Sequence, residues 1–556
     1  MKKAILKALV CASALLTFHF SIFTCAQAQD SVFSYTHQGN TLYYIINSAD
    51  DAMVVPPLWP NYDEENDASW TGYTEPSGAV VVPDSVPFDG TMHAVTEVGH
   101  DAFYHCEQMT SVSLPEAVTA IGEWAFGKCH GLTSFTLPAS VTAIDQYAFA
   151  RCYGLTSVTI SEGVTEIPYR CFYKDSLLAE VNLPDGLTRI GNYAFTDCIT
   201  LPTINFPEGL TVIDNNAFDY CASLNSITLP SSLDSIGIAA FGYCESLEEI
   251  AIPGGVSNIG QWAFNNCHSL QSITLGEGVE RIGDCAFRQC GRLTSIDLPS
   301  SLRVMGREAF SQCNQLRHVD LPSSLEEVGA MAFAYCDVID SLFFPPSTHQ
   351  MDYAALAVCP NLKVLQLPEG LEKVDSMLLA FSSGIETIVV PSHVTRIEYA
   401  AFADCYHLHK VQLPASVTYM GDSLFVDRTP LDTLVMGCEV PPTLGTDVFE
   451  HYNTVLIVPC GAAESYRQHE VWGRFANILE SCNGIDGTQA SSPAVYVRNG
   501  RIIVEGADSE TVSVYDMLGH LTQTFKQSST QAIPSGVYLV KVGNRPAKKV
   551  FVMNNK

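Results

Sequence analysis

The hydrophobic residues of this chain recur every 23 positions over most of its length, and polar residues fill the gaps between them. Each unit opens on Phe, continues with Cys at +3, Leu at +6, Ile or Val at +9, Leu at +11 and Pro at +12, and carries Ile, Val or Met at +18. Fifteen units without an insertion indicate one short module stacked on copies of itself, because each copy needs neighbours to cover its apolar residues. The units open at Phe103, Phe126, Phe149, Phe172, Phe195, Phe218, Phe241, Phe264, Phe287, Phe310, Phe333, Leu356, Leu379, Phe402 and Phe425.

Each unit contains one clear β-strand signal. The residues at +9 and +11, for example Ile227 and Leu229, are two apart, which is the strand period, and their neighbours include β-branched residues. Pro230 then ends the strand, because proline has no N–H to donate to a ladder. Stacked in register, the strands form a long parallel sheet, and fifteen of them at about 4.8 Å per strand span on the order of 70 Å. The pattern therefore predicts an elongated, right-handed and β-rich solenoid in which the Phe side chains point into one common core column.

The repeated motif Ile-x-Leu-Pro, followed by Ile-Gly-x-x-Ala-Phe-x-x-Cys, resembles the BspA-like class of leucine-rich repeats over residues 100–437. The resemblance implies a leucine-rich-repeat solenoid of fifteen 23-residue coils. It also implies a class of proteins associated with adhesion to matrix proteins and to other bacteria. The chain departs from the motif in the Cys position at Asp175, Ser382 and Arg428, and again around 344–351. We expect local irregularity there without loss of the frame.

The segments that flank the repeats fit caps, which are needed because the first and last coils of a stacked array expose its core. Residues 30–99 are rich in strand signals punctuated by Pro and Gly, which predicts an N-terminal β-rich cap. Residues 438–482 contain one more apolar strand at 454–459 and a predicted helix at 462–469. This segment resembles the C-terminal cap of BspA-like arrays. The residues expected to cover the last apolar coil are Tyr466, Trp472 and Phe475.

A second domain is predicted at the C-terminus. Residues 483–493 form a linker rich in Gly, Ser and Asp, and residues 494–556 carry short alternating strands that predict a small β-sandwich. The segments at 514–519, 534–540 and 548–553 resemble the C-terminal sorting domain of type IX secretion. That resemblance implies secretion machinery as a partner of this domain. The alternative is a small accessory β-domain without an address function.

Residues 1–29 predict an export signal. Two lysines precede an apolar stretch from about residue 8 to residue 23, and small residues at 26–28 mark a cleavage site. Cys25 raises the alternative of a lipoprotein anchor, but the three residues before it match a lipoprotein signal poorly. No other stretch reaches the roughly 18 apolar residues of a membrane helix. We therefore expect an exported protein, at the cell surface or extracellular, without a transmembrane segment.

The net charge narrows the choice of partners. The chain carries a formal charge of −31, and loss of the three lysines of the leader makes it −34. Nucleic acids and anionic membranes are bound through basic patches, which such an acidic body disfavours. Nucleic acid is therefore excluded as an expected partner.

The cysteines permit more than one interpretation. Nineteen cysteines in an exported chain would ordinarily indicate disulfides, and stacked coils place the twelve cysteines at +3 about 5 Å from their neighbours. In-register coils aim these side chains in one direction, so we favour buried thiols that act as small hydrophobic groups. A ladder offers no tetrahedral ligand set for a metal. Beyond the ladder, Cys438, Cys460 and Cys482 permit one disulfide, with the pairing open.

The chain carries no recognisable catalytic, metal-binding or cofactor-binding signature. It contains no His-Glu-x-x-His, Gly-x-Ser-x-Gly, phosphate-binding or dinucleotide-binding motif. His407 and His409 form the tightest histidine group and lack a third ligand, which favours a surface role. The acidic run at 63–67 lacks the alternating spacing of a calcium loop and is predicted to be solvated. We predict neither an enzyme nor a cofactor.

Two sets of positions are candidates for partner binding. The +8 position is mostly Ser or Thr, which predicts a flat polar strand face, best explained by hydroxyl groups that support strand pairing. Aromatic side chains occur at the −2 position, where they can anchor a protein partner or stack on sugars. For them we favour simple packing over the turn beneath the Phe. The candidate residues are Trp124, Tyr147, Tyr193 and Trp262.

These features predict a secreted or cell-surface protein that recognises macromolecules. The resemblance implies adhesion to host matrix proteins or to other cells. One alternative is a glycan-capture surface protein, which needs aromatic platforms, and another is a structural surface component. A third is an enzyme with an unrecognised site, for which no residues stand out. The expected ligand is an extracellular protein or glycan.

Overall fold

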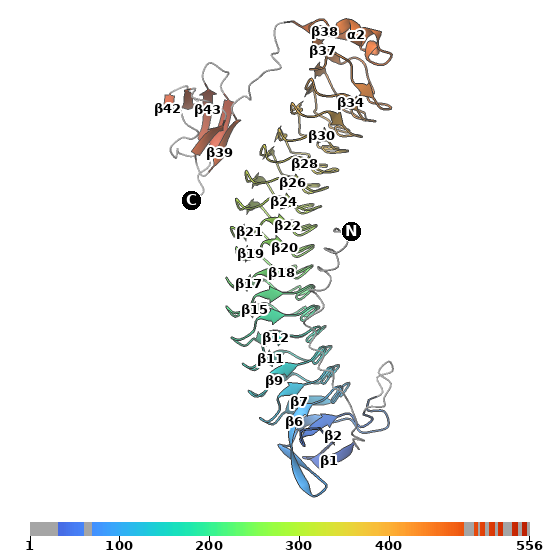
Figure 1. Cartoon of the computed structure of the whole chain (residues 1–556), viewed down its shortest axis with the longest axis vertical. Helices are drawn as coiled ribbons and strands as arrows, with labels where there is room; N and C mark the ends of the chain where they lie inside the picture. Colours follow the sequence, from blue (N-terminus) through green and yellow to red (C-terminus); the bar gives the residue numbers. More distant parts are fainter. Residues whose placement is uncertain are drawn as a thin grey trace, which may run out of the picture.

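The computed structural model describes residues 32–59, 69–426 and 428–482, and the strands of a C-terminal segment between 494 and 552. The described residues up to 482 form an elongated solenoid whose coils stack along one axis (Figure 1). The predicted leader, the acidic run at 63–67 and the linker at 483–493 lie outside the described residues. In the described parts, no helix has the length and apolar character needed to cross a membrane.

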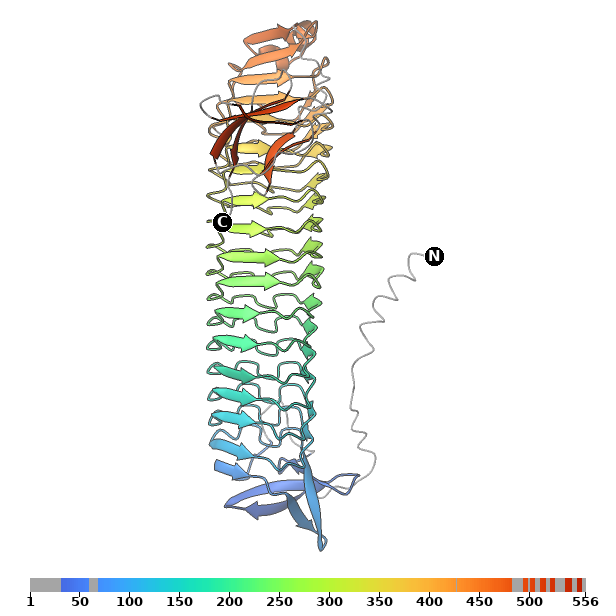
Figure 2. The ribbon, with the colours of Figure 1, turned by 90° about the vertical axis from the view of Figure 1, so that its left-hand side faces the viewer.

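Each coil contributes one longer strand to a parallel ladder along the solenoid (Figure 2). The strands pair in register one unit apart, as Ser157 does with Ser134 and Glu180. The hydrogen-bonded ladder is interrupted after β7, β13, β17, β25 and β29. At the break before Thr203, Pro202 lacks the N–H that Ala179, at the same position, donates to a carbonyl of the coil before it. The strands of this long ladder are β7 (Met109–Ser113), β9 (Ser134–Thr136), β11 (Ser157–Thr159), β13 (Glu180–Asn182), β15 (Thr203–Asn205), β17 (Ser226–Thr228), β19 (Glu249–Ile252), β21 (Ser272–Leu275), β23 (Ser295–Asp297), β25 (His318–Asp320), β27 (Ser341–Phe343), β29 (Val364–Gln366), β31 (Thr387–Val389), β33 (Lys410–Leu413), β35 (Thr433–Met436), β37 (Val455–Pro459) and β38 (Asn477–Ser481).

A second parallel ladder, which the sequence pattern did not predict, runs along another face of the coils. Its two-residue strands end on the apolar residue at +18, which points into the core. In other units the residue that follows the short strand donates its N–H to the preceding coil, as Asp145 does to the Ile121 carbonyl. Pro168, which follows β12, has no N–H to donate, and the ladder breaks between β10 and β12. The strands of this short ladder are β8 (Ala120–Ile121), β10 (Ala143–Ile144), β12 (Glu166–Ile167), β14 (Arg189–Ile190), β16 (Val212–Ile213), β18 (Ser235–Ile236), β20 (Asn258–Ile259), β22 (Arg281–Ile282), β24 (Val304–Met305), β26 (Glu327–Val328), β28 (Gln350–Met351), β30 (Lys373–Val374), β32 (Arg396–Ile397), β34 (Tyr419–Met420) and β36 (Thr443–Leu444).

The N-terminal strands start both ladders. β6 pairs in parallel with β8 of the short ladder, and β4 pairs in parallel with β7 of the long ladder. β1, β2 and β3 form an antiparallel meander, and β3 continues it onto β6. This arrangement covers the first coil, the role expected of a cap. The six strands are β1 (Phe33–His37), β2 (Asn40–Ile46), β3 (Ala52–Val55), β4 (Gly78–Val81), β5 (Ser85–Phe88) and β6 (Thr91–Val98).

The Phe residues that open the units form one continuous column in the core. From Phe103 to Phe333 each ring stacks on the next with centroids 5.2–5.7 Å apart and planes within 13° of parallel. These rings have no exposed surface. The prediction that they point into a common column is confirmed. Leu356 and Leu379 interrupt the ring stack without opening the core, since both are fully buried.

The chain reverses around each Phe through two residues in the left-handed backbone region. The residues at −2 and +2 have φ near +60° in unit after unit, and none of those that the structure describes is Gly. Along this turn every second backbone amide points towards the next coil. The N–H groups of Trp124, Phe126 and Lys128 donate to carbonyls of the next coil at 2.8–3.3 Å. The intervening amides bond three residues back within the coil. This turn edge is therefore a third set of hydrogen bonds between coils.

The cysteines at +3 are free, fully buried thiols. From Cys129 to Cys405, each Sγ in this position donates to the carbonyl oxygen of the opening residue one coil earlier, at 3.0–3.4 Å. Burial raises the pKa of the Cys313 thiol to about 12, which keeps it protonated and able to donate. The favoured interpretation of buried thiols is confirmed, with the addition of a hydrogen-bonding role.

Ser382 and Asp175, two of the residues that replace Cys at +3, differ in the hydrogen bonds that they make. Ser382 reproduces the thiol bond, since its hydroxyl donates to the Leu356 carbonyl at 2.7 Å and accepts the Cys359 N–H at 3.1 Å. Asp175 accepts the Cys152 N–H through Oδ1 at 2.7 Å, but its buried Oδ2 has no partner among the described residues. Burial raises the pKa of the Asp175 carboxyl well above its usual value. A carboxyl is thus a poor substitute for the thiol.

The predicted count of fifteen coils is too low. The long ladder has fifteen strands up to β35, and β37 and β38 extend it to seventeen. In these two steps the register falls one position short of a full unit, since Thr433 pairs with Val455 and Val455 with Asn477. Phe449 stacks on Phe425 and continues the ring column, one position later than the repeat would place it. The apolar strand predicted at 454–459 is therefore β37, and β38 was not predicted because the repeat frame changes here.

The C-terminal end of the core is closed by aromatic side chains from the segment between β37 and β38. The helix α2 (Ala463–Gln468) and the 3-10 turn η2 (Trp472–Arg474) bury Tyr466 and Trp472, and Phe475 packs against Phe449. Trp472 Nε1 donates to the Pro442 carbonyl at 3.1 Å. These residues cover the end of the column as expected.

A disulfide joins Cys460 to Cys482 and ties the end of β38 to the end of β37. The predicted single disulfide is therefore present, and the structure supplies its pairing. Cys438 remains a buried thiol whose Sγ lies 3.2 Å from the Pro414 and Val417 carbonyls.

The C-terminal segment forms two small antiparallel sheets around a core of its own, as expected of a small β-sandwich. β39 and β40 form a hairpin, and the other four strands lie in the order β42-β41-β43-β44. The shared core is made by Ile502, Val504, Val512, Val514, Val540 and Val542. The six strands are β39 (Ala494–Arg498), β40 (Arg501–Glu505), β41 (Val512–Asp516), β42 (Leu521–Phe525), β43 (Gly536–Val542) and β44 (Lys548–Val552).

We expect Asp175→Ser to raise the melting temperature, by an amount that grows with pH. In the unfolded chain the carboxyl titrates near its ordinary pKa, whereas burial holds the pKa well above that value in the folded protein. Between the two pKa values the unfolded chain binds fewer protons, so the stability of the native protein falls as pH rises. At pH 7 the variant should be more stable by about 1–3 kcal/mol. Thermal melts at pH 4 and pH 8 test this, with the exposed Asp234→Ser as control. A gain independent of pH, or shared by the control, would contradict it.

Candidate recognition surface

The solenoid presents the long strand ladder, the short strand ladder and the turn edge to solvent. On the long ladder most side chains at +8 are Ser or Thr, and Thr203 Oγ1 donates to the Ser226 carbonyl of the next coil at 3.1 Å. This face is therefore polar along most of its length. Phe343, Val364 and Val389 interrupt it with exposed apolar side chains around the irregular coils.

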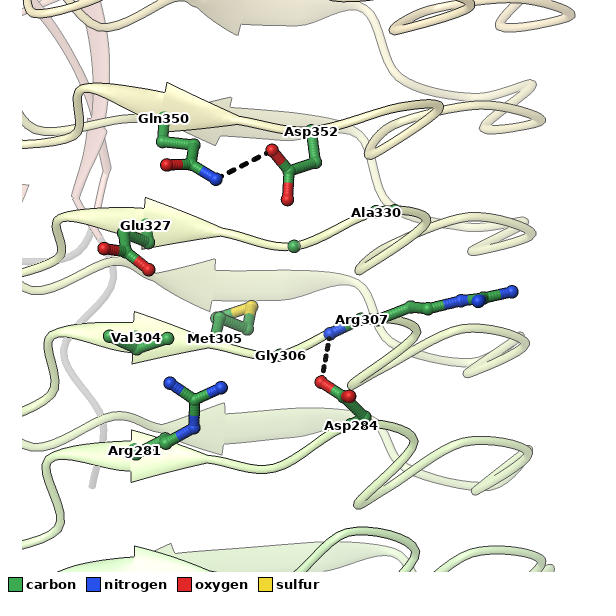
Figure 3. A pocket seen from close by; sticks show the side chains of 11 residues that line it. Arg281, Asp284, Val304, Met305, Gly306, Arg307, Glu327, Ala330, Gln350 and Asp352 are labelled. Atoms are coloured by element: carbon green, nitrogen blue, oxygen red, sulfur yellow. Dashed lines mark hydrogen bonds between the residues drawn. The ribbon is translucent and has the colours of Figure 1, made fainter. Parts of the chain in front are cut away.

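The short ladder carries a shallow polar hollow of about 230 Å³ (Figure 3). Gly306, Gly329 and Ala330 leave its floor without long side chains, and Arg281 and Asp352 lie at its margins. Its polar groups are partly used within the protein. Gln350 donates to Asp352 at 2.9 Å, and Asp284 accepts the Arg307 N–H at 2.9 Å. Pockets for small molecules are usually larger, about 300–1,000 Å³, and mostly apolar. This hollow does not resemble a substrate pocket.

The turn edge brings three of the four candidate aromatic residues together. Trp124 and Tyr147 stack with ring centroids 4.3 Å apart, and Tyr193 lies two coils beyond Tyr147 in the same row. Trp262 stands apart from them, with 42% of its surface exposed. The −2 position holds these side chains outside the core, because the left-handed backbone there turns them away from the Phe column.

Arg170 is the centre of this group and occupies the −2 position between Tyr147 and Tyr193. Its guanidinium carbon lies 4.9–5.6 Å from four tyrosine ring centroids, within the range of cation–π attraction. Its Nη1 donates to the Tyr147 hydroxyl at 2.8 Å. We call this set the aromatic cluster. It consists of Tyr104, Trp124, Tyr147, Tyr169, Arg170, Tyr173 and Tyr193.

The packing of the cluster limits what its rings can bind. One face of Trp124 is covered by Tyr147, and the edge of Tyr104 meets the indole at 5.5 Å. The same indole lies across Gly127, where a Cβ would come within 2.4 Å of it. Sugars stack on free ring faces, so Trp124 is poorly placed for them. The cluster offers ring edges, hydroxyls and cationic groups instead.

Arg170 and the three tyrosines at other positions of the cluster were not predicted from the sequence. The prediction rested on the +8 and −2 rows, and within the −2 row on aromatic side chains alone. Tyr169 stands at −3, and Tyr104 and Tyr173 stand at +1. Comparing every row across neighbouring units would have shown that these aromatic and basic residues fall in consecutive coils.

The structure brings no other predicted group together as a ligand set. His407 contacts the Ser383 carbonyl, whereas His409 contacts Asp432 at 2.8 Å, so the two rings serve different partners. Cys460 and Cys482 lie beside Glu480, but the disulfide removes the thiolates that a metal would need. Glu480 accepts the Ala463 N–H at 3.0 Å and so holds the start of α2.

The sequence matches the family model described as the BspA type leucine rich repeat region, with matched segments at 96–225, 165–291, 211–340 and 328–455. These segments cover more than half of the chain, so the protein belongs to the BspA-type leucine-rich-repeat family. Its repeats are those of a scaffold class rather than of an enzyme family. Residues 483–552 match a domain of unknown function, DUF6383. No curated protein matches the sequence.

The chain is similar to three solved structures, of which the first supports the fold. A leucine-rich repeat protein from Bacteroides ovatus is 21% identical with a TM-score of 0.51, covering 70% of this chain and 95% of its own. A leucine rich cell surface protein from Faecalibacterium prausnitzii is 26% identical with a TM-score of 0.39, covering 74% of this chain and 96% of its own. The pneumococcal vaccine antigen PcpA is 12% identical with a TM-score of 0.36, covering 81% and 99%.

Proposed function

We propose that this protein is an exported, non-enzymatic recognition protein that binds an extracellular macromolecule, and that its role is adhesion to host matrix proteins or to other cells. The aromatic cluster is the observation that carries this proposal. Tyr, Trp and Arg are the residues most enriched at the energetic centres of protein interfaces. The cluster gathers all three on a rigid edge of the solenoid. Trp124, Tyr147 and Tyr193 are accordingly the proposed partner-binding residues.

A non-enzymatic role fits the chemistry of the described residues. The thiols at +3 are fully buried and held protonated, so they are unsuited to nucleophilic attack. The hollow on the short ladder is small, polar and open. A long rigid surface is suited to contact with a large partner.

Glycan capture is the second candidate function, and Trp262 is the observation that favours it. Its indole is exposed and lies outside the aromatic cluster, so it retains a surface on which a sugar ring can stack. Other exposed aromatic side chains, such as Tyr220 and Tyr353, lie on other coils. We place protein recognition first, because the aromatic cluster joins Tyr, Trp and Arg at one site.

We also propose where the protein is located and which segments direct it there. The leader at residues 1–29 directs export across the inner membrane, and residues 494–556 act as a type IX sorting domain that delivers the protein to the cell surface or the medium. The second step is supported by the antiparallel strands of this segment and by its separation from the repeats.

Arrays of matrix proteins and glycans should reveal a protein ligand for the full exported chain. Tyr147→Ala combined with Tyr193→Ala should weaken its binding by at least about 30-fold, because truncation at an interface centre typically costs about 2 kcal/mol or more. Trp262→Ala should leave protein binding unchanged, and thermal melts check that each variant is folded. Binding to glycans alone that is lost in Trp262→Ala would replace adhesion with glycan capture. Absence of binding on both arrays would favour a role as a structural surface component.

Deleting residues 494–556 should trap the repeat region in the periplasm. The reason is that the proposed sorting domain is lost while the leader remains. Immunoblots of periplasm, outer membrane and medium measure the distribution, and replacing the tail with an unrelated β-domain of similar size serves as the control. Unchanged surface display of the truncated chain would show that the tail is an accessory domain.

A further inference from the structure

One row of side chains on the long ladder changes from polar to apolar along the solenoid. At +10, a position on the outer face of the ladder, the first ten units carry only Ser, Thr, Asn, Ala or Asp. From the eleventh unit onward the row is mostly apolar, and Phe343, Val389 and Leu479 are exposed by 46%, 58% and 54%. We call this part of the row the apolar stripe. It consists of Phe343, Gln366, Val389, Gln412 and Val435, continued in register by Ile457 and Leu479.

The apolar stripe is exposed but narrow, which limits the kind of partner that fits it. Neighbouring exposed apolar side chains on a soluble protein mark a contact site. A stable complex between free partners buries roughly 800 Å² on each side, far more than a stripe about one side chain wide offers, even with the exposed Val364 beside it. A tethered partner needs less contact, because the tether holds it at a high effective concentration. The stripe therefore favours a partner that belongs to the same chain.

The C-terminal β-domain, which comprises the strands between 494 and 552, is tethered within reach of the stripe. The chain leaves the solenoid at the end of β38, the strand that carries Leu479, and the linker 483–493 has eleven residues. β38 lies four steps along the long ladder from β31 and six from β27, about 19 and 29 Å at 4.8 Å per step. A Gly- and Ser-rich chain of eleven residues spans about 17–20 Å on average and about 36–40 Å when extended. The domain can therefore reach every part of the stripe.

The β-domain has a sheet face that suits the stripe. Val514 and Val540 pair within the core of the domain, so the next residue along each strand falls on the opposite face of the four-stranded sheet. Two sheets that pack apolar faces together are a common arrangement in proteins. By register, the opposite face holds the positions of two pairs of large apolar or aromatic residues, Tyr515 with Leu539 and Val537 with Phe551.

Net charge attracts the β-domain to the solenoid without fixing the place of contact. Residues 494–556 carry +4, and taking this and the +3 of residues 1–29 from the total of −31 leaves −38 for residues 30–493. Opposite net charges favour the approach of the two parts. Beside the stripe both signs occur, since Asp340, Glu386 and Asp432 stand near Lys363 and Lys410. Apolar contact, rather than local ion pairing, therefore selects the stripe.

We propose that the C-terminal β-domain docks the open face of its four-stranded sheet on the apolar stripe of the same chain. The inference rests neither on the adhesion role nor on the sorting role proposed above. It explains why the +10 row becomes apolar only in the coils that the tethered domain can reach.

Cross-linking of residues 30–556, produced as one chain, tests the docking directly. A short amine-reactive cross-linker should join Lys363 or Lys410 to lysines of the β-domain, and mass spectrometry of the peptides measures the yield. Phe343→Gln combined with Val389→Gln should lower this yield by about tenfold, because the docked state loses two buried apolar side chains. Gln already occupies the stripe in the neighbouring coils, so these substitutions are compatible with the strands.

The matched control is Leu177→Gln combined with Ile199→Gln, which removes two exposed apolar side chains from the fourth and fifth units. It should change the yield by less than about twofold, because these sites are far from the stripe. Thermal melts check that each variant is folded. Equal yields in the native chain and the stripe variant would overturn the inference, as would loss of the native cross-links at about 300 mM salt, which screens charge but not apolar contact. A mixture of isotopically light and heavy protein identifies cross-links between molecules; if these account for the yield, the stripe binds a second copy and the inference is wrong.

Discussion

The hydrogen bonds along the turn edge are the constraint on which the rest of this structure depends. Two residues of each unit adopt left-handed backbone conformations on either side of the Phe, and the amides between them point alternately within the coil and towards the next one. Ordinary L-residues lose roughly 1–2 kcal/mol in this conformation, and the protein places two of them there in each coil. The cost is offset because every coil gains bonds to its neighbour and a buried ring.

The core positions and the turn-edge positions differ in how many residue types they accept. Rings of the Phe column pack at nearly constant spacing, and the Cys thiols tie each coil to the Phe carbonyl before it, so these positions tolerate few residue types. The −2 and +2 positions face solvent and hold residues as different as Trp124, Arg151 and Val358. A surface can therefore be varied along the solenoid without altering its core, and the aromatic cluster is one such surface.

The repeat frame was sufficient to predict the solenoid, the ring column, the parallel sheet and the aromatic end cap. It could not predict the left-handed turns, because bulky residues such as Trp124 and Val358 occupy positions where glycine would be the usual signal. The short ladder was missed because each of its strands is so short that it leaves no alternating pattern. The strand of β37 was predicted, but as part of the cap, and β38 was missed; the register of both is one position shorter than the repeat.

The same reasoning explains the partial success at the candidate site. Scanning the −2 row found Trp124, Tyr147 and Tyr193, which lie together in space. It could not find Arg170 as their centre, because cation–π contacts depend on how rows from different coils meet. Residues that are far apart in the sequence form one surface only when the stacking of the coils brings the same repeat position of neighbouring units to within about 4.8 Å.

Relief of backbone strain at Val358 is the most direct measure of the turn-edge constraint. Val358 has a φ of 57°, an outlying conformation for a β-branched residue, whereas Asn tolerates it. Val358→Asn should therefore raise the melting temperature, with a gain in stability of about 1 kcal/mol. The same substitution at Val364, which lies in the regular strand β29, should lower it, because Asn is disfavoured in strands. Opposite signs for the two variants are the predicted result; a lower melting temperature for both would contradict the account.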